Sequence, residues 1–143
     1  MKKNFLAGAF TVVVLTASVI PGSVQAQQPG IKRTELQRHD LSVPGREAIQ
    51  VRIDFDPGAM ILRHSHPGEE IIYVLKGWLE YQVGSDPPMR LRAGDALFIP
   101  AHTIHTAKNV GDGNASELAT YVVPKGKGAL HNRQLNAMTR VRM

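Results

Sequence analysis

The feature that most constrains the fold is the regular recurrence of turn-forming residues through the middle of the chain. Between residues 47 and 123, glycine, proline, asparagine and aspartate interrupt the apolar segments at intervals of about 8 to 12 residues. The clearest interruptions are Asp56-Pro57-Gly58, residues 84–88 (GSDPP) and residues 111–114 (GDGN). Segments this short between turns are typical of strands, and the pattern predicts an all-β sandwich or barrel.

The segments between the turns have the periodicity of strands. Residues 49–55 show it best, because every second residue is apolar and the residues between them are polar. An alternation with period two is typical of a strand with one buried face. Strands are predicted at 49–55, 59–66, 70–75, 78–83, 89–92, 96–99, 104–109 and 117–123.

The N-terminus has the pattern of an export signal. Lys2 and Lys3 precede an apolar, uncharged segment at residues 5–20, which Pro21-Gly22 then interrupts. Small residues at the expected spacing predict cleavage after Ala26, which leaves 143 − 26 = 117 residues. The apolar segment is shorter than the roughly 20 residues of a membrane-spanning helix. We therefore predict a periplasmic or secreted bacterial protein that is not membrane-bound after cleavage.

The composition excludes several kinds of site. The sequence contains no cysteine, which excludes disulfides, thiolate zinc sites and cysteine nucleophiles. The formal net charge is +5, and removal of Lys2 and Lys3 leaves 5 − 2 = +3. The remaining basic residues are not interleaved with aromatic residues, so nucleic acid is not an expected partner.

These observations divide the chain into four parts. Residues 1–26 are the predicted signal peptide, and residues 27–46 form an N-terminal arm. Residues 47–123 form the β-barrel as a single domain, and residues 124–143 form a C-terminal tail. The beginning of the arm is polar and contains Pro29-Gly30, which predicts a flexible segment.

Potential metal ligands are concentrated in two short segments. His64 and His66 lie two residues apart on one predicted strand, so their side chains are expected to project from the same face. Imidazoles in this arrangement suit zinc, iron, copper, nickel or manganese. A turn follows, and a carboxylate at the start of the returning strand can face the same histidines. Alternation alone leaves Glu69 and Glu70 both open for this position.

These segments resemble the two motifs of the cupin family. Residues 58–77 read GAMILRHSHPGEEIIYVLKG and match the spacing of the first motif, with Glu70 as its glutamate. Residues 94–109 read GDALFIPAHTIHTAKN and are similar to the second motif, with His105 as its histidine and Asn109 as its asparagine. Two motifs in order form a more specific signal than either motif alone.

The resemblance implies a small double-stranded β-helix barrel, or jelly roll, and suggests a homodimer. It implies that His64, His66, Glu70 and His105 bind one divalent metal ion, which could be Fe(II), Mn, Zn, Ni or Cu. An octahedral ion held by these side chains keeps two positions open for a small-molecule substrate or ligand. Among the reactions of the family, a dioxygenase reaction on an oxygen-rich or aromatic molecule is favoured over a lyase or isomerase reaction. A non-catalytic metal- or small-ligand-binding module is the alternative.

His102 departs from the second motif, which has glycine at this place. Glycine there permits a positive φ, and histidine tolerates that region better than most residues. His102 is therefore either a turn residue that faces water or a proton donor or acceptor at the mouth of the pocket, and it is the one catalytic candidate. Five large side chains are expected to serve packing rather than the metal: Met60, Tyr73, Trp78, Tyr81 and Met89.

Overall fold

The computed structural model describes residues 28–129. Within this range the chain forms nine β-strands and no helix, so none of these residues belongs to a helix that could cross a membrane. The all-β prediction is thus confirmed. The predicted signal peptide, its cleavage site and most of the predicted tail lie outside the described residues, and these predictions stay predictions.

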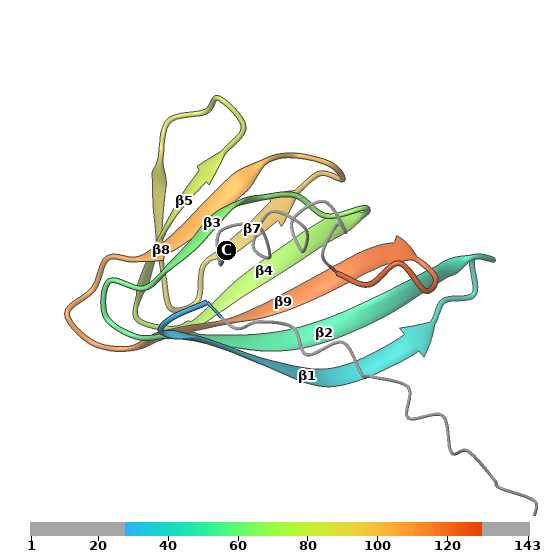
Figure 1. Ribbon diagram of the computed structural model, residues 1–143, viewed down its shortest axis with the longest axis horizontal. Coiled ribbons are helices and arrows are strands. Elements are labelled where there is room, and N and C mark those ends of the chain that lie inside the picture. Colours follow the sequence, from blue (N-terminus) through green and yellow to red (C-terminus); the bar gives the residue numbers. More distant parts are fainter. Residues whose placement is uncertain (1–27, 130–143) are drawn as a thin grey trace, which may run out of the picture.

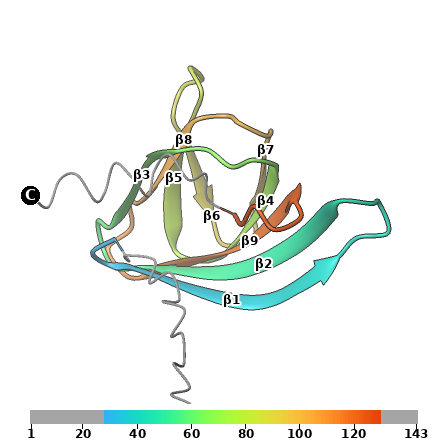
Figure 2. The same ribbon diagram turned by 45° about the vertical axis from the view of Figure 1, so that its right-hand side comes forward.

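The strands form two antiparallel sheets that face each other (Figures 1 and 2). The first sheet has the order β1 (Ile31–Asp40), β2 (Arg46–Phe55), β9 (Ala115–Pro124), β4 (Glu69–Lys76) and β7 (Ala96–Ile99). The second has the order β3 (Met60–His64), β8 (His105–Asn109), β5 (Trp78–Val83) and β6 (Met89–Arg92). This arrangement is the jelly roll that the sequence predicts.

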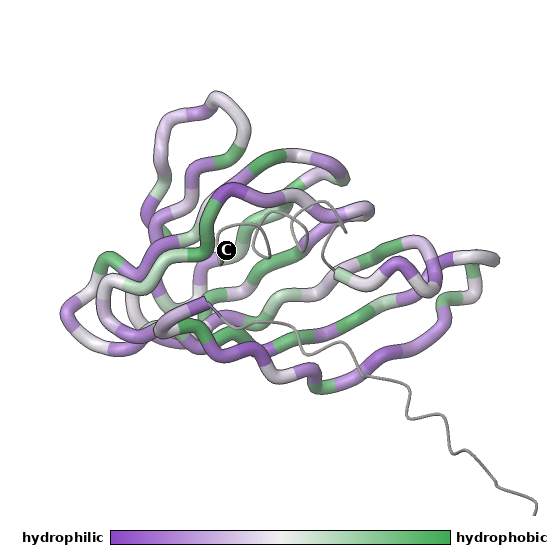
Figure 3. The backbone as a smooth tube through the Cα atoms, in the orientation of Figure 1, coloured by the Kyte–Doolittle hydropathy of each residue, from purple (hydrophilic) through white to green (hydrophobic). Residues whose placement is uncertain are grey.

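The core consists of the apolar residues that alternate along the long strands. In β2, Ile49, Val51, Ile53 and Phe55 are buried, with exposed fractions of 1–8%, and the residues that alternate with them are half-buried or exposed. Figure 3 shows the same alternation of hydrophobic and hydrophilic residues along the tube. Burial of each such side chain contributes about 1.5–3 kcal/mol to stability. The period-two pattern of residues 49–55 therefore arises because one face of the strand packs in the core.

Strand β1 was not expected, because its residues fall in the segment predicted to be an arm. It pairs with β2 from Ile31↔Phe55 to Asp40↔Glu47, yet Ile31 is its one buried residue. An edge strand receives backbone hydrogen bonds from a single neighbour and need not bury its side chains. A polar edge strand of this kind leaves no periodic signal in the sequence.

The outer face of β4 and β7 carries an unusual concentration of exposed apolar side chains. Ile71, Tyr73 and Leu75 on β4 are 42–47% exposed, and Phe98 on β7 is 56% exposed. Ile71 and Phe98 are directly paired across the two strands. We refer to these four residues as the apolar face.

The packing expectations for the five large side chains are met only in part. Tyr81 is buried, and Met89 packs against the core. Tyr73 and Trp78 are 47% and 46% exposed, so the expectation that they pack in the core is wrong. Met60 was expected in the core or in an interface; it is 39% exposed, which excludes the core, and the interface stays a prediction. On their strands these residues lie next to buried neighbours, so their side chains point out of the barrel. Hydrophobicity alone does not show which of two adjacent apolar residues faces the core.

Asn109, the asparagine of the second motif, connects the loops at one end of the barrel. Its Nδ2 donates hydrogen bonds to the carbonyl oxygens of Asp56 (3.0 Å) and Gly113 (2.8 Å). Its Oδ1 accepts a hydrogen bond from the amide of Gly111 at 3.0 Å. The side chain is 1% exposed, and its role is therefore structural.

Candidate metal centre

The four residues expected to bind a metal come from three strands and one turn. His64 ends β3 and pairs directly with His105, which begins β8. Glu70 lies at the start of β4, in the opposite sheet. His66 lies in the turn between β3 and β4.

The three imidazoles form one cluster, and the carboxylate of Glu70 lies beside two of them. The ligand nitrogens of His64, His66 and His105 all lie within 4.8 Å of one another. The Oε2 atom of Glu70 lies 3.1 Å from Nε2 of His66 and 3.1 Å from Nε2 of His105. All four residues are buried, with exposed fractions between 2% and 8%.

The route by which His66 reaches the cluster differs from the expectation. The sequence places both histidines on one strand, but β3 ends at His64, and the pairing of β3 with β8 shifts register between Ile61 and His64. The turn, not strand alternation, therefore brings His66 back to the cluster. Gly68 makes this turn possible, because a Cβ at that position would overlap the carbonyl oxygen of Val122 on β9.

The structure distinguishes between the two candidate glutamates. Glu70 is 3% exposed and faces the histidines, whereas Glu69 is half-buried and has the opposite orientation on β4. Ile72 and Val74 follow Glu70 on the inner face and are fully buried. They continue the inner face of β4 from Glu70 into the hydrophobic core.

Backbone carbonyls fix which nitrogen of each imidazole is available. Nδ1 of His64 contacts the carbonyl oxygen of Leu62 at 2.8 Å, and Nδ1 of His105 contacts that of Thr103 at 2.9 Å. Nδ1 of His66 contacts the carbonyl oxygen of Ala129. A carbonyl oxygen only accepts hydrogen bonds, so each Nδ1 carries a proton and each Nε2 is left with a lone pair for another partner.

The electrostatics of the cluster suit a cation. Burial, followed by the proximity of His105 and His66, lowers the pKa of His64 to about 3, so its imidazole is neutral at pH 7. Burial alone would raise the pKa of Glu70, but the imidazoles of His105 and His66 beside it outweigh burial and hold that pKa below its ordinary value. Glu70 is therefore a carboxylate in the protein interior.

Two buried atoms at the centre of the cluster lack hydrogen bonds. Nε2 of His66 and Oε2 of Glu70 have no hydrogen-bond partner within residues 28–129. Two acceptors at 3.1 Å repel each other unless a proton or a cation lies between them. Three imidazoles and one carboxylate are also a donor set that zinc, iron and similar ions prefer. The residues present fit a divalent metal ion.

A second group of polar residues lies in the interior and was not singled out from the sequence. The hydroxyl of Tyr81 donates a hydrogen bond to Glu117, which is 1% exposed. Burial, and then the charge of Glu70, raise the pKa of Glu117 to about 8. The ring of Tyr121 lies 4.7 Å from the ring of His66, and its buried hydroxyl makes no hydrogen bond with residues 28–129. Glu117 and Tyr121 occupy inward positions of the predicted strand 117–123, and that alternation is the signal that could have identified them.

His102 lies beside the cluster without joining it. Its φ of 62° matches the positive φ that the glycine of the motif would allow. Its amide donates a hydrogen bond to the carbonyl oxygen of His66 at 2.9 Å, and its side chain is exposed. The backbone of His102 thus supports the turn that carries His66, while its imidazole is not part of the three-histidine cluster.

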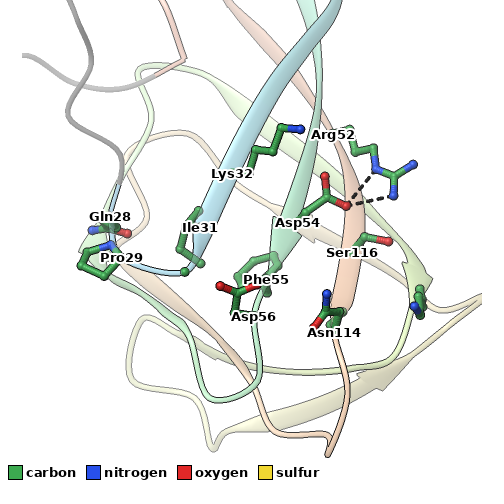
Figure 4. Close-up of a pocket in the computed structure, with 13 residues that line it drawn as sticks. Gln28, Pro29, Ile31, Lys32, Arg52, Asp54, Phe55, Asp56, Asn114 and Ser116 are labelled. Atoms are coloured by element: carbon green, nitrogen blue, oxygen red, sulfur yellow. Dashed lines mark hydrogen bonds and ion pairs between the residues drawn. The ribbon is translucent and has the colours of Figure 1, made fainter.

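A separate cleft lies towards the other end of β9 (Figure 4). Ser116 in this cleft is five residues from Tyr121 along β9, a distance of about 17 Å. Arg52 and Asp54 in the cleft form an ion pair with 2.9 Å between Nη2 and Oδ1. The cleft contains none of the predicted site residues.

Comparisons with known proteins agree with the fold. A family model described as "Cupin domain" matches residues 51–131. The germin-like protein subfamily 2 member 1 of Arabidopsis thaliana is 32% identical over 89 residues, which are 57% of this chain and 41% of that protein. The chain spans less than half the length of the curated relatives that it matches.

Several solved structures share the fold at sequence identities of 25% or more. KdgF from Halomonas sp. is 27% identical, with a TM-score of 0.58, over 72% of this chain and 87% of that chain. An oxalate oxidase structure is 25% identical, with a TM-score of 0.55, over 80% of this chain and 68% of that chain.

Proposed function

The chain belongs to the cupin domain family, and on that premise we propose that it binds one divalent metal ion through His64, His66, Glu70 and His105. We propose further that the bound ion acts on a small oxygen-rich or aromatic molecule. The observation that carries the proposal is the pair of buried acceptors, Nε2 of His66 and Oε2 of Glu70, that face each other without hydrogen bonds. A cation between them satisfies both atoms.

The four side chains would fill only part of the coordination sphere of an octahedral ion. Three neutral imidazoles and one carboxylate leave a net charge of +1 on a divalent ion. Such an ion polarises a bound oxygen atom, lowers the pKa of a bound water or, if it is redox-active, activates dioxygen. Tyr121 lies next to His66, and its hydroxyl stays protonated because burial and the charge of Glu70 raise its pKa. That hydroxyl can donate a hydrogen bond to a small molecule held at the site.

We favour oxidative chemistry with iron over a lyase or isomerase reaction. The support is the likeness to an oxalate oxidase, whose name describes an oxidation. A facial triad of the oxygenase type needs two histidines and one carboxylate, whereas this cluster has a third histidine. The proposal is therefore for a dioxygenase of the three-histidine, one-glutamate kind. Manganese, zinc, nickel and copper remain candidate ions.

The second candidate function is a non-catalytic module that binds a metal or a small ligand. It is favoured by the burial of all four side chains, which limits the access of a substrate. One experiment separates the two functions. The purified mature chain is analysed for metal and loaded with each candidate ion. It is then tested for oxygen consumption and for loss of substrate with catechol-like, flavonoid and uronate-like compounds.

Each outcome of this experiment has a clear reading. Bound metal with oxygen consumption supports the dioxygenase. Bound metal with conversion of substrate but no oxygen consumption supports a lyase or isomerase. Bound metal without any turnover favours the binding module. Failure to retain any of the ions contradicts the metal-dependent enzyme and the metal-binding form of the module.

We also propose that the protein is exported and forms a homodimer. The export signal at residues 1–26 supports a periplasmic or secreted location, which cell fractionation and N-terminal sequencing would test. The apolar face on β4 and β7 supports a homodimer, because exposed apolar side chains that lie together commonly mark a contact surface.

A further inference from the structure

One of the three imidazoles is held by a different part of the chain from the other two. The carbonyls that contact Nδ1 of His64 and of His105 belong to Leu62 and Thr103, each two residues earlier. The carbonyl that contacts Nδ1 of His66 belongs to Ala129, 63 residues later. The orientation of His66 therefore depends on a segment beyond the last strand.

This segment follows a defined path from β9 back to the cluster. After Pro124, the amide of Lys125 donates to the carbonyl oxygen of Gly45 at 3.0 Å. The amide of Gly126 donates to Oε1 of Glu47, a buried carboxylate, at 3.1 Å. Two positive φ angles, 76° at Gly126 and 70° at Gly128, bend the backbone in a conformation that glycine adopts most readily.

The end of the path is anchored as well. Ala129 is half-buried and packs against the hydrophobic core. Its carbonyl oxygen accepts the hydrogen bond from Nδ1 of His66 at that point. The segment is thus fixed both where it leaves β9 and where it meets the cluster.

We infer that residues 125–129 form a strap that positions His66 for metal binding. The strap fixes the Nδ1 proton and the ring orientation, so that Nε2 points at Glu70 with its lone pair available. The inference rests on the proposed function, because it assigns the strap a role toward the same metal ion. In the full chain, metal affinity thereby depends on a segment outside the barrel that carries none of the metal ligands.

A matched pair of substitutions in the full chain tests this role. Gly128→Val strains the strap, because valine strongly disfavours a φ of 70°. Gly58→Val introduces the same strain at a φ of 72° in the turn before β3. At both glycines an added Cβ would meet no atom within 4 Å, so backbone strain is the shared effect of the two substitutions.

We expect Gly128→Val to weaken the binding of Zn²⁺, measured by competition with a chelating dye, about 10- to 100-fold. Gly58→Val should leave the affinity within about twofold of wild type. Nitrogen NMR of the histidine side chains in the metal-free wild type should show a proton on Nδ1 of His66, and Gly128→Val should reduce this signal for His66 but not for His64 or His105. The NMR measurement on wild type needs no variant to fold.

The results that overturn the inference differ from those that overturn the proposed function. Equal Zn²⁺ affinities for Gly128→Val and wild type, or a wild-type His66 without a proton on Nδ1, would overturn the strap while leaving the metal site intact. A wild-type chain that binds none of Zn²⁺, Fe²⁺, Mn²⁺, Ni²⁺ and Cu²⁺ although Nδ1 of His66 is protonated would overturn the proposed function. In that case the strap would still be supported as the element that orients His66.

Discussion

Nε2 of His66 and Oε2 of Glu70 lie 3.1 Å apart in the protein interior, and neither atom has a hydrogen-bond partner within residues 28–129. Buried acceptors without partners are costly, at roughly 1–3 kcal/mol each. Their proximity raises that cost, because two lone pairs face each other. A site that binds a cation provides a physical reason for such an arrangement to persist.

Removal of His105 should abolish metal retention. His105 contributes Nε2, which lies 3.1 Å from Glu70, and no other histidine of the described range is placed to replace it. We expect His105→Ala to reduce the metal content, measured by elemental analysis, from about one ion per chain to nearly none. Glu69→Ala is the control, because Glu69 does not face the cluster, and it should retain the ion. Full occupancy in His105→Ala would show that the ligand set is wrong.

Glu117 should make the protein less stable as the pH rises. Its pKa is raised from 4.5 in a model compound to about 8 in the fold, chiefly by burial. The folded state therefore binds more protons than the unfolded state between these values, and the free energy of unfolding falls as pH increases through this range. The loss should approach a few kcal/mol near pH 8.

The substitution Glu117→Gln isolates this effect from other titrating groups. An amide cannot ionise but still accepts the hydrogen bond from Tyr81. We expect urea unfolding at pH 5 to give similar stabilities for the two proteins and unfolding at pH 8 to favour Glu117→Gln. A difference that stays constant from pH 5 to pH 8 would contradict the raised pKa.

The sequence predicts the strands in which buried and exposed residues alternate. It does not predict features that depend on backbone hydrogen bonds or on contacts between distant segments. Strand β2 is evident because one face is buried, whereas β1 is hidden because its edge position requires hydrogen bonds but little burial. Glu70 is identified over Glu69 only through the spacing of a family motif. The contact between His66 and Ala129 joins residues 63 apart through a backbone carbonyl, which no side-chain pattern can reveal.

The turn between His66 and Glu70 should not tolerate a side chain at Gly68. An added Cβ would overlap the backbone of Val122 on β9, so the turn or the strand must move. We expect Gly68→Ala to lower the free energy of unfolding by about 1–3 kcal/mol in denaturant unfolding and to weaken metal binding. Gly113→Ala is the matched control, because nothing lies within 4 Å of its added Cβ and its φ is not positive. Equal stability of the two variants would indicate that the turn has room to relax.

The apolar face should hold two copies of the chain together. Phe98 is 56% exposed and pairs with Ile71, so a charge at this position would be buried in a dimer that uses the face. We expect light scattering to give the mass of a dimer for wild type and of a monomer for Phe98→Asp. Val43→Asp changes a residue with 60% exposure in the loop between β1 and β2, and it should remain dimeric. A monomeric wild type would contradict the homodimer.

Replacement of His102 by glycine separates its backbone role from any role of its imidazole. The φ of 62° and the amide hydrogen bond to His66 are both available to glycine, so the turn should keep its shape. Relief of the left-handed strain should offset the greater flexibility of glycine, and the melting temperature should change little. Because the imidazole is outside the three-histidine cluster, the metal content should remain that of wild type.

If His102 transfers a proton during turnover, kcat should fall about 10²- to 10⁴-fold, with a changed pH profile. Unchanged kcat across the pH range would assign His102 to the turn alone.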